Sequence, residues 1–193
     1  MLIHDITKHL NTIKQLSENK DSNITQYISE IVDDFNIMNP IDYCNNPTVN
    51  LITHRYYEIC KKNNINFTIS IKNANIDFIK EHDITALLDN LLENAVESAL
   101  MTNEKFIDFS ISTRNSNFVI IKISNSCNKK PKYIDGTLVS SKSTSGMHGI
   151  GTRSIKRVVE KYNGNLEMKF DSNTNTFTST IGINSNTQNY ERI

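Results

Sequence analysis

The sequence has 193 residues, enough for one or two domains with a sizeable core, and its 21 basic residues balance its 21 acidic residues. No apolar run approaches the ~18 residues that a membrane-spanning helix needs, and no signal peptide is visible. The three cysteines are scattered, which argues against a disulfide framework and a structural zinc site. We therefore expect a reduced, cytoplasmic protein.

The charge is divided unevenly along the chain. Residues 1–46 hold 3 basic against 7 acidic residues, whereas residues 47–193 hold 18 against 14. This asymmetry predicts two parts with different partners. In the first part, apolar residues recur every three or four positions, as in two amphipathic helices joined by a turn at residues 20–23. The two apolar stripes are Ile3, Ile6, Leu10 and Ile13, and then Ile24, Ile28, Ile31, Phe35 and Met38.

Two such narrow stripes cannot bury themselves well in an isolated helical hairpin. Pairing with a second copy would complete a four-helix bundle, so we predict that residues 1–46 form a homodimerisation hairpin. Pro40 follows the end of the second helix, and residues 40–47 have the composition of a linker.

Residues 47–184 combine segments of helical periodicity with segments in which apolar and polar residues alternate, as in strands exposed to solvent on one face. This predicts an α+β domain, a mixed sheet with helices on one face. Residues 126–147 lack periodicity and read as a long functional loop, and residues 185–193 as a frayed tail. We expect helices at 48–63, at 83–101 and after Gly151, the last with Gly164 as its C-cap. Strands are expected at 65–71, 107–111, 119–123, 166–170 and 177–183.

The helix that begins near Asp83 carries a polar stripe opposite its apolar face, formed by Asn90, Glu93, Asn94 and Glu97. A solvated surface would account for such a stripe. However, asparagine is a poor helix former, and two of them one turn apart cost helix stability without need. Amide and carboxylate oxygens are hard ligands that suit Mg²⁺, so the stripe is a candidate for holding a metal-bound phosphate.

Three of the six glycines, Gly146, Gly149 and Gly151, fall within six residues ahead of a helix. They do not form a Walker P-loop, because no Gly-Lys-Ser/Thr follows. They do place small residues at a helix N-terminus, which favours anions, and residues 127–161 carry a net charge of +6. The alternative is a flexible loop before an ordinary basic helix.

Three motifs in order resemble a known family. NLLENAVESA, residues 90–99, resembles the N box of the GHKL ATPases, a superfamily that includes gyrase, MutL and histidine kinases. GMHGIGTRSIKRVVEKYNG, residues 146–164, resembles their second glycine box. HDITKHLNTI, residues 4–13, resembles the phosphoacceptor box of the Agr-type quorum-sensing receptor kinases. The resemblance implies a dimeric helical bundle followed by a two-layer α/β sandwich of the GHKL, or Bergerat, type.

The resemblance also implies a sensor histidine kinase fragment that binds Mg-ATP and phosphorylates itself on histidine. Asn94 would chelate Mg²⁺, and Asn90 would support the phosphates or a metal-bound water. Glu93 would polarise the groups at this site or help to coordinate the metal. Gly149 and Gly151 would let a lid approach the phosphates and close over them. The other implied ATP contacts are Asn125, Lys142, His148 and Ile150.

His4 is the implied nucleophile, and Asp5 would fix its tautomer or take its proton. The phosphoryl group would then pass to an aspartate on the receiver domain of a response regulator. No direct nucleic-acid binding is implied, and a membrane-anchored sensor region is expected to lie outside these residues.

The sequence departs from the family pattern in three places. Asn125 stands where many GHKL proteins have an adenine-binding aspartate, although an amide carbonyl also accepts a hydrogen bond. Lys8 stands where an asparagine is frequent, which puts phosphatase activity in doubt, and Thr152 replaces a usual leucine. Two alternatives stay open, a phosphotransfer or scaffold protein with a degenerate ATPase fold, and a GHKL serine kinase or ATPase.

Overall fold

A computed structural model of the chain describes residues 11–18, 24, 27, 43–72, 74–115, 117–128, 132–134, 137–139 and 150–185. The chain divides into two compact units, Met1–Asn39 and Pro40–Ile193. In the first unit, residues 11–18, Ile24 and Tyr27 are helical. The remainder of the predicted hairpin, with His4 and Asp5, lies outside the described residues, so the bundle and its dimerisation stay predictions.

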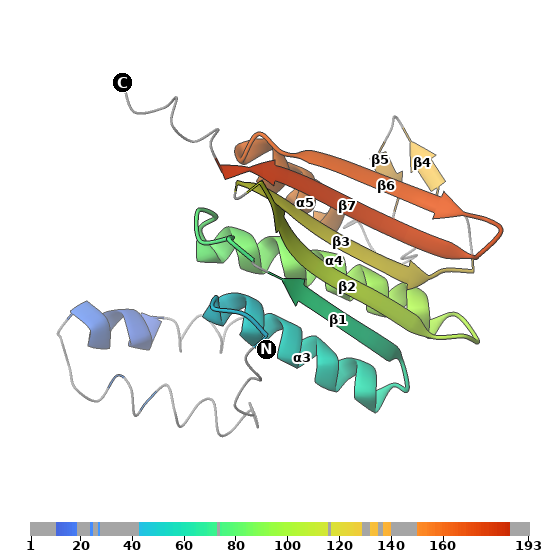
Figure 1. Cartoon of the computed structure of the whole chain (residues 1–193). Coiled ribbons are helices and arrows are strands. Elements are labelled where there is room, and N and C mark those ends of the chain that lie inside the picture. Colours follow the sequence, from blue (N-terminus) through green and yellow to red (C-terminus); the bar gives the residue numbers. More distant parts are fainter. Residues whose placement is uncertain are drawn as a thin grey trace. The chain divides into compact units, whose positions relative to one another are not determined.

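The second unit is built on a five-stranded mixed sheet (Figure 1). Its strand order is β1-β2-β3-β7-β6, in which β1 and β2 are parallel and all other neighbours are antiparallel. The predicted mixed sheet is confirmed. The strands are β1 (Asn66–Lys72), β2 (Phe106–Arg114), β3 (Phe118–Ser126), β6 (Asn165–Asp171) and β7 (Thr176–Asn184).

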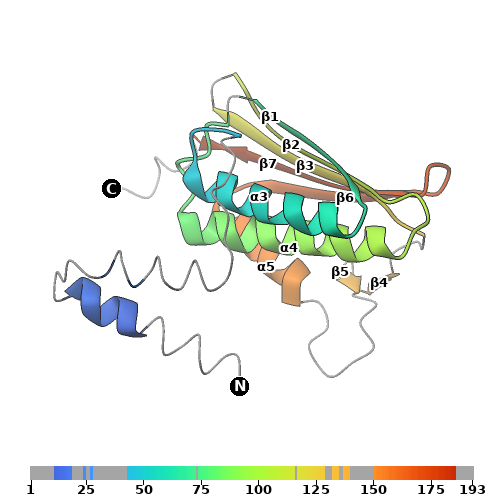
Figure 2. The ribbon, with the colours of Figure 1, turned by 90° about the horizontal axis from the view of Figure 1, so that it is seen from below.

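Three helices cover one face of this sheet, and Figure 2 shows them side by side in a single layer. They are α3 (Pro47–Lys62), α4 (Glu81–Leu100) and α5 (Ile150–Lys161). Within the region expected to be an aperiodic loop, the structure contains a short antiparallel pair, β4 (Lys132–Ile134) and β5 (Thr137–Val139). No helix in the described part of the chain is long and apolar enough to cross a membrane.

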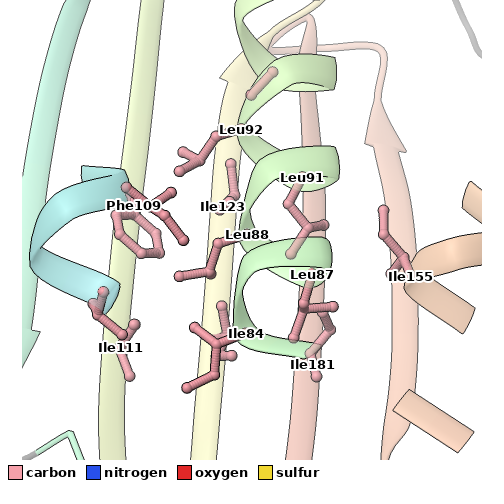
Figure 3. Close-up of a cluster of buried hydrophobic side chains, with 14 of the residues drawn as sticks. Ile84, Leu87, Leu88, Leu91, Leu92, Phe109, Ile111, Ile123, Ile155 and Ile181 are labelled. Atoms are coloured by element: carbon pink, nitrogen blue, oxygen red, sulfur yellow. The ribbon is translucent and has the colours of Figure 1, made fainter. Parts of the chain in front are cut away.

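The core lies between the apolar face of α4 and the face of the sheet that the helices cover. The apolar face of α4 presents Ile84, Leu88 and Leu92, each at most 1% exposed, toward the strands (Figure 3). Alternate residues of β2 and β3 point back at the helix, among them Phe109 and Ile123. Burying a side chain of this size stabilises the fold by about 1.5–3 kcal/mol, so this interface fixes the position of α4.

Helices α3 and α5 end in the same way, at an asparagine with left-handed backbone. Asn64 has φ 54° and Asn163 has φ 49°. After Asn163, the N–H of Gly164 donates to the Val159 carbonyl at 2.8 Å, the closing bond of a Schellman motif. The sequence predicted Gly164 as the cap, but Asn163 takes the left-handed position. Gly164 is small because a side chain there would collide with the Gly182 carbonyl at 2.9 Å.

Candidate functional site

The predicted polar stripe of α4 lies on the side of the helix that faces away from the core. Glu93 and Asn94 are exposed, and Asn90 and Glu97 are partly exposed. The neighbours of α4 divide this stripe between two sides. Asn90 lies toward α5, whereas the charge of Glu93 acts on Tyr56 of α3. The residues that the sequence placed together therefore have different surroundings.

The side toward α5 brings the glycine segment to the asparagine stripe. A Cβ atom at Gly151, in the first turn of α5, would lie 2.8 Å from Asn90 Oδ1. Asn90 Nδ2 donates to the Ala86 carbonyl at 2.5 Å. The amide nitrogen is therefore occupied within α4, and the oxygen, an acceptor only, is the atom that faces α5.

The same side of α4 reaches the end of strand β3 two turns later. Ser98, at i+8 from Asn90, donates its hydroxyl hydrogen to the Ser126 carbonyl at 3.0 Å. The preceding residue, Asn125, is 3% exposed and donates from Nδ2 to the same carbonyl at 2.9 Å. Asn94 stands one turn from Asn90 and one turn from Ser98, so it lies between the start of α5 and the end of β3.

The side of α4 toward α3 is a separate ionic cluster. Arg55 pairs with Asp89, and the Tyr56 hydroxyl donates to the Asp89 backbone carbonyl at 3.1 Å. Burial first, and then the charge of Asp89, raise the pKa of Tyr56 to about 12, and the charge of Glu93 adds to this rise. Tyr56 therefore stays protonated at neutral pH, and Glu93 belongs to the neighbourhood of α3 more than to that of Gly151.

The first turn of α4 is tied to the end of α5. Asp83 Oδ2 accepts hydrogen bonds from Lys161 Nζ at 2.6 Å and from the Tyr162 hydroxyl at 2.7 Å. The Lys80 N–H donates to that hydroxyl at 2.9 Å. Burial alone would raise the pKa of Asp83, but the bonds from Lys161 and Tyr162 and the charge of Lys161 hold it below its usual value. Helix α5 is thus hydrogen-bonded to α4 at its end and lies close to Asn90 of α4 at its start.

Sequence reasoning did not find the residues that fix these contacts. Asp83 lies 78 positions before Lys161 and 79 before Tyr162, and no motif links it to them. Ser98 was visible one turn after Asn94, so the helical spacing could have extended the stripe to it. Its partner Ser126 could not have been named, because the pairing depends on how α4 lies across the sheet.

The other predicted site residues are placed as follows. Ile150 begins α5, whereas Lys142, His148 and Gly149 lie outside the described residues. Among the residues that the structure describes, no group of three or more histidine, cysteine, aspartate or glutamate side chains could hold a metal ion.

Comparisons with known proteins identify the family of the second unit. A profile of the GHKL domain matches residues 79–184, more than half of the chain. The chain is also 30% identical over 99 residues to a probable C4-dicarboxylate sensor kinase of Bacillus subtilis (strain 168). That match covers 48% of this chain and only 18% of the sensor kinase, so the two share one part of a longer protein.

Solved structures show the same fold at low sequence identity. The nucleotide-free catalytic domain of histidine kinase ThkA superposes with a TM-score of 0.56 at 18% identity, over 77% of this chain and 97% of that one. Histidine kinase AdeS of Acinetobacter baumannii gives a TM-score of 0.52 at 12% identity, over 95% and 98% of the two chains. By the profile match and this shared fold, the chain belongs to the GHKL family.

Proposed function

We propose that this protein is the cytoplasmic part of a sensor histidine kinase. It binds Mg-ATP at the surface of α4, phosphorylates His4, and passes the phosphoryl group to an aspartate of a response regulator. One observation carries the proposal. The start of the glycine-containing helix meets Asn90, and the end of β3 meets Ser98, so both border the exposed Asn94 on one helix side.

The residues at this place fit a magnesium-bound triphosphate. Asn94 is exposed and carries an amide oxygen, and the N-terminus of α5, a position that favours anions, begins beside Asn90 one turn away. The Asn90 oxygen is the atom that faces Gly151, so on this side Asn90 suits a hydrogen-bond donor such as a metal-bound water. Mg²⁺, when bound, would neutralise charge on the phosphates during transfer.

The remaining residues would act around the nucleotide. Asn125 has its Nδ2 bonded to Ser126, so its carbonyl oxygen is the atom left to accept from an adenine amino group. The phosphates would be contacted by Lys142, His148, Gly149 and Ile150. Glu93 would polarise or help to coordinate at the metal site from the side of α4 that faces α3. The His4 imidazole nitrogen would attack the γ-phosphorus, forming a phosphoramidate and releasing ADP, while Asp5 would hold or take the imidazole proton.

The partners follow from this activity. Residues 1–46 would form a homodimer, and the receiver domain of a response regulator would dock to take the phosphoryl group. The Agr-type quorum-sensing subfamily is the one that residues 4–13 suggest. A sensor region in the membrane would belong to the same protein, outside residues 1–193.

The decisive experiment labels the purified chain with γ-³²P-ATP and Mg²⁺ and compares His4→Gln with His9→Gln. The two histidines share the first predicted helix, so each substitution has a similar effect on its stability. We expect acid-labile label on the parent and on His9→Gln, and none on His4→Gln. Phosphotransfer is then read as label lost to an added receiver domain.

Three results would contradict the proposal. Acid-labile label that survives His4→Gln would exclude His4 as the nucleophile, and acid-stable label would indicate a serine kinase. The absence of saturable binding of a fluorescent ATP analogue at millimolar concentration, with Mg²⁺ present, would indicate a degenerate site and a scaffold function.

A further inference from the structure

The absence of a side chain at Gly151 has a specific cause in the structure. A Cβ atom there would lie 2.8 Å from Asn90 Oδ1 and 3.7 Å from Asn90 Cγ. Approaches below 3.0 Å are essentially never made by real Cβ atoms. Gly151 lies inside α5, and its φ is outside the left-handed region. Space, and not backbone freedom, therefore requires glycine at this position.

Asn90 cannot easily move away from an added methyl group. Its side chain is short, and its Nδ2 is held by the Ala86 carbonyl at 2.5 Å. Reversing the amide would bring two oxygens together at that distance, which is strongly unfavourable. The Asn90 carboxamide is thus held between the backbone of its own helix and the first turn of α5.

Helix α5 cannot easily move away either. In its first turns, Thr152 is 6% exposed and Ile155 is fully buried against the core. At its other end, Lys161 and Tyr162 both bond to Asp83 of α4. A shift of the first turn would therefore disturb packing along the whole interface between the two helices.

We propose that Gly151 is a positioning residue for nucleotide binding, because only a residue without a side chain lets the first turn of α5 hold the Asn90 carboxamide in place. This inference rests on the proposed function, in which Asn90 serves the metal-bound nucleotide. It gives Gly151 a packing role, in contrast to the sequence-based expectation that this glycine lets a lid close.

A double-mutant cycle tests the proposal. The parent, Gly151→Ala, Asn90→Ala and the double variant are titrated with a fluorescent ATP analogue in Mg²⁺. We expect Gly151→Ala to weaken binding by on the order of tenfold to hundredfold, since misplacement of about 1 Å is costly at such sites. In the Asn90→Ala background the same change should have no further effect. Losses that multiply would overturn the proposal.

Thermal melting without nucleotide, in EDTA, provides a second cycle that needs no binding. Gly151→Ala should lower the melting temperature of the parent. It should raise that of Asn90→Ala, because alanine forms helix better than glycine once the obstacle is gone. Ser154→Ala, also in α5, is the matched control and should shift both backgrounds equally. Equal shifts from Gly151→Ala would also overturn the proposal.

The two cycles separate this inference from the proposed function. If the parent binds no nucleotide, the proposed function fails and the positioning role fails with it, whereas the melting cycle still decides whether the two side chains are in conflict. If the parent binds nucleotide and the melting temperatures show no coupling, only the role of Gly151 is wrong.

Discussion

Two regions of α4 use polar residues in opposite ways. At its first turn, Asp83 is 7% exposed and accepts hydrogen bonds from Lys161 and Tyr162. In its middle, Asn94 is exposed on the same side of the helix. A buried and paired polar group contributes to folding, and an exposed weak helix former does not. The first turn therefore holds the two helices together, and the middle is where we propose that the nucleotide binds.

The largest expected effect comes from the apolar face that supports both regions. Leu88 is fully buried between α4 and the sheet, so Leu88→Ala should lower the free energy of unfolding by about 2–5 kcal/mol. Urea unfolding followed by circular dichroism measures it. Leu51→Ala, at a side chain that is 46% exposed on α3, is the control and should change little. A small effect of Leu88→Ala would mean that α4 is not seated on the sheet as described.

The second largest expected effect tests whether the first turn of α4 contributes to stability and not to nucleotide binding. Asp83→Asn keeps the shape of the side chain but removes the charge that pairs with Lys161, so it should lower the free energy of unfolding by about 1–3 kcal/mol. Nucleotide affinity, measured well below the melting temperature, should change little. Glu81→Gln, an exposed change in the same turn, is the matched control. A stable variant that has lost nucleotide binding would show that the first turn belongs to the site.

The pH dependence of the free energy of unfolding should distinguish the parent from Asp83→Asn. The pKa of Asp83 is lower in the folded protein than in the unfolded chain, so its contribution is present above the unfolded pKa and is lost as pH falls through the folded one. The stability gap between the parent and Asp83→Asn should therefore shrink below about pH 4, the usual range of aspartate. Urea titrations from pH 7 to pH 3 measure it. A stability difference that stays constant over this pH range would contradict a stabilising role for the ionised Asp83 side chain.

Local periodicity was enough to predict the scaffold. The 3.6-residue repeat placed α4 to within two residues at its start, and the alternation of Phe109 and Ile111 identified β2. Strands β4 and β5 have three residues each, which is too short for an alternating pattern to be recognised. The cap of α5 was misplaced by one residue because Asn163 and Gly164 can each adopt left-handed backbone, and only the packing against Gly182 decides between them.

The candidate site could be predicted only in part, for a related reason. A helical wheel groups Asn90, Glu93 and Asn94 in one stripe, but it does not show which helix lies on which side. The structure places Asn90 beside α5, and the charge of Glu93 acts on Tyr56 of α3. Contacts such as that between Asn90 and Gly151 join residues about sixty positions apart, so they depend on packing that local sequence does not encode.

The smallest expected effect on stability is at Asn94, and this variant best separates a role in nucleotide binding from a role in folding. Asn94→Ala removes an exposed amide from a helix and replaces it with the best helix former, so the free energy of unfolding should stay within about 0.5 kcal/mol of the parent or rise slightly. Binding of the fluorescent ATP analogue in Mg²⁺ should be lost, because the proposed metal ligand is gone.

The matched control is Asn165→Ala, at an exposed amide of β6, which should leave nucleotide binding intact. Since the Asn94→Ala chain is expected to be at least as stable as the parent, its loss of binding cannot be attributed to unfolding. A variant Asn94→Ala that is less stable than the parent and still binds nucleotide would reverse the comparison. It would assign the middle of α4 to stability, and Asn94 would not be the magnesium ligand.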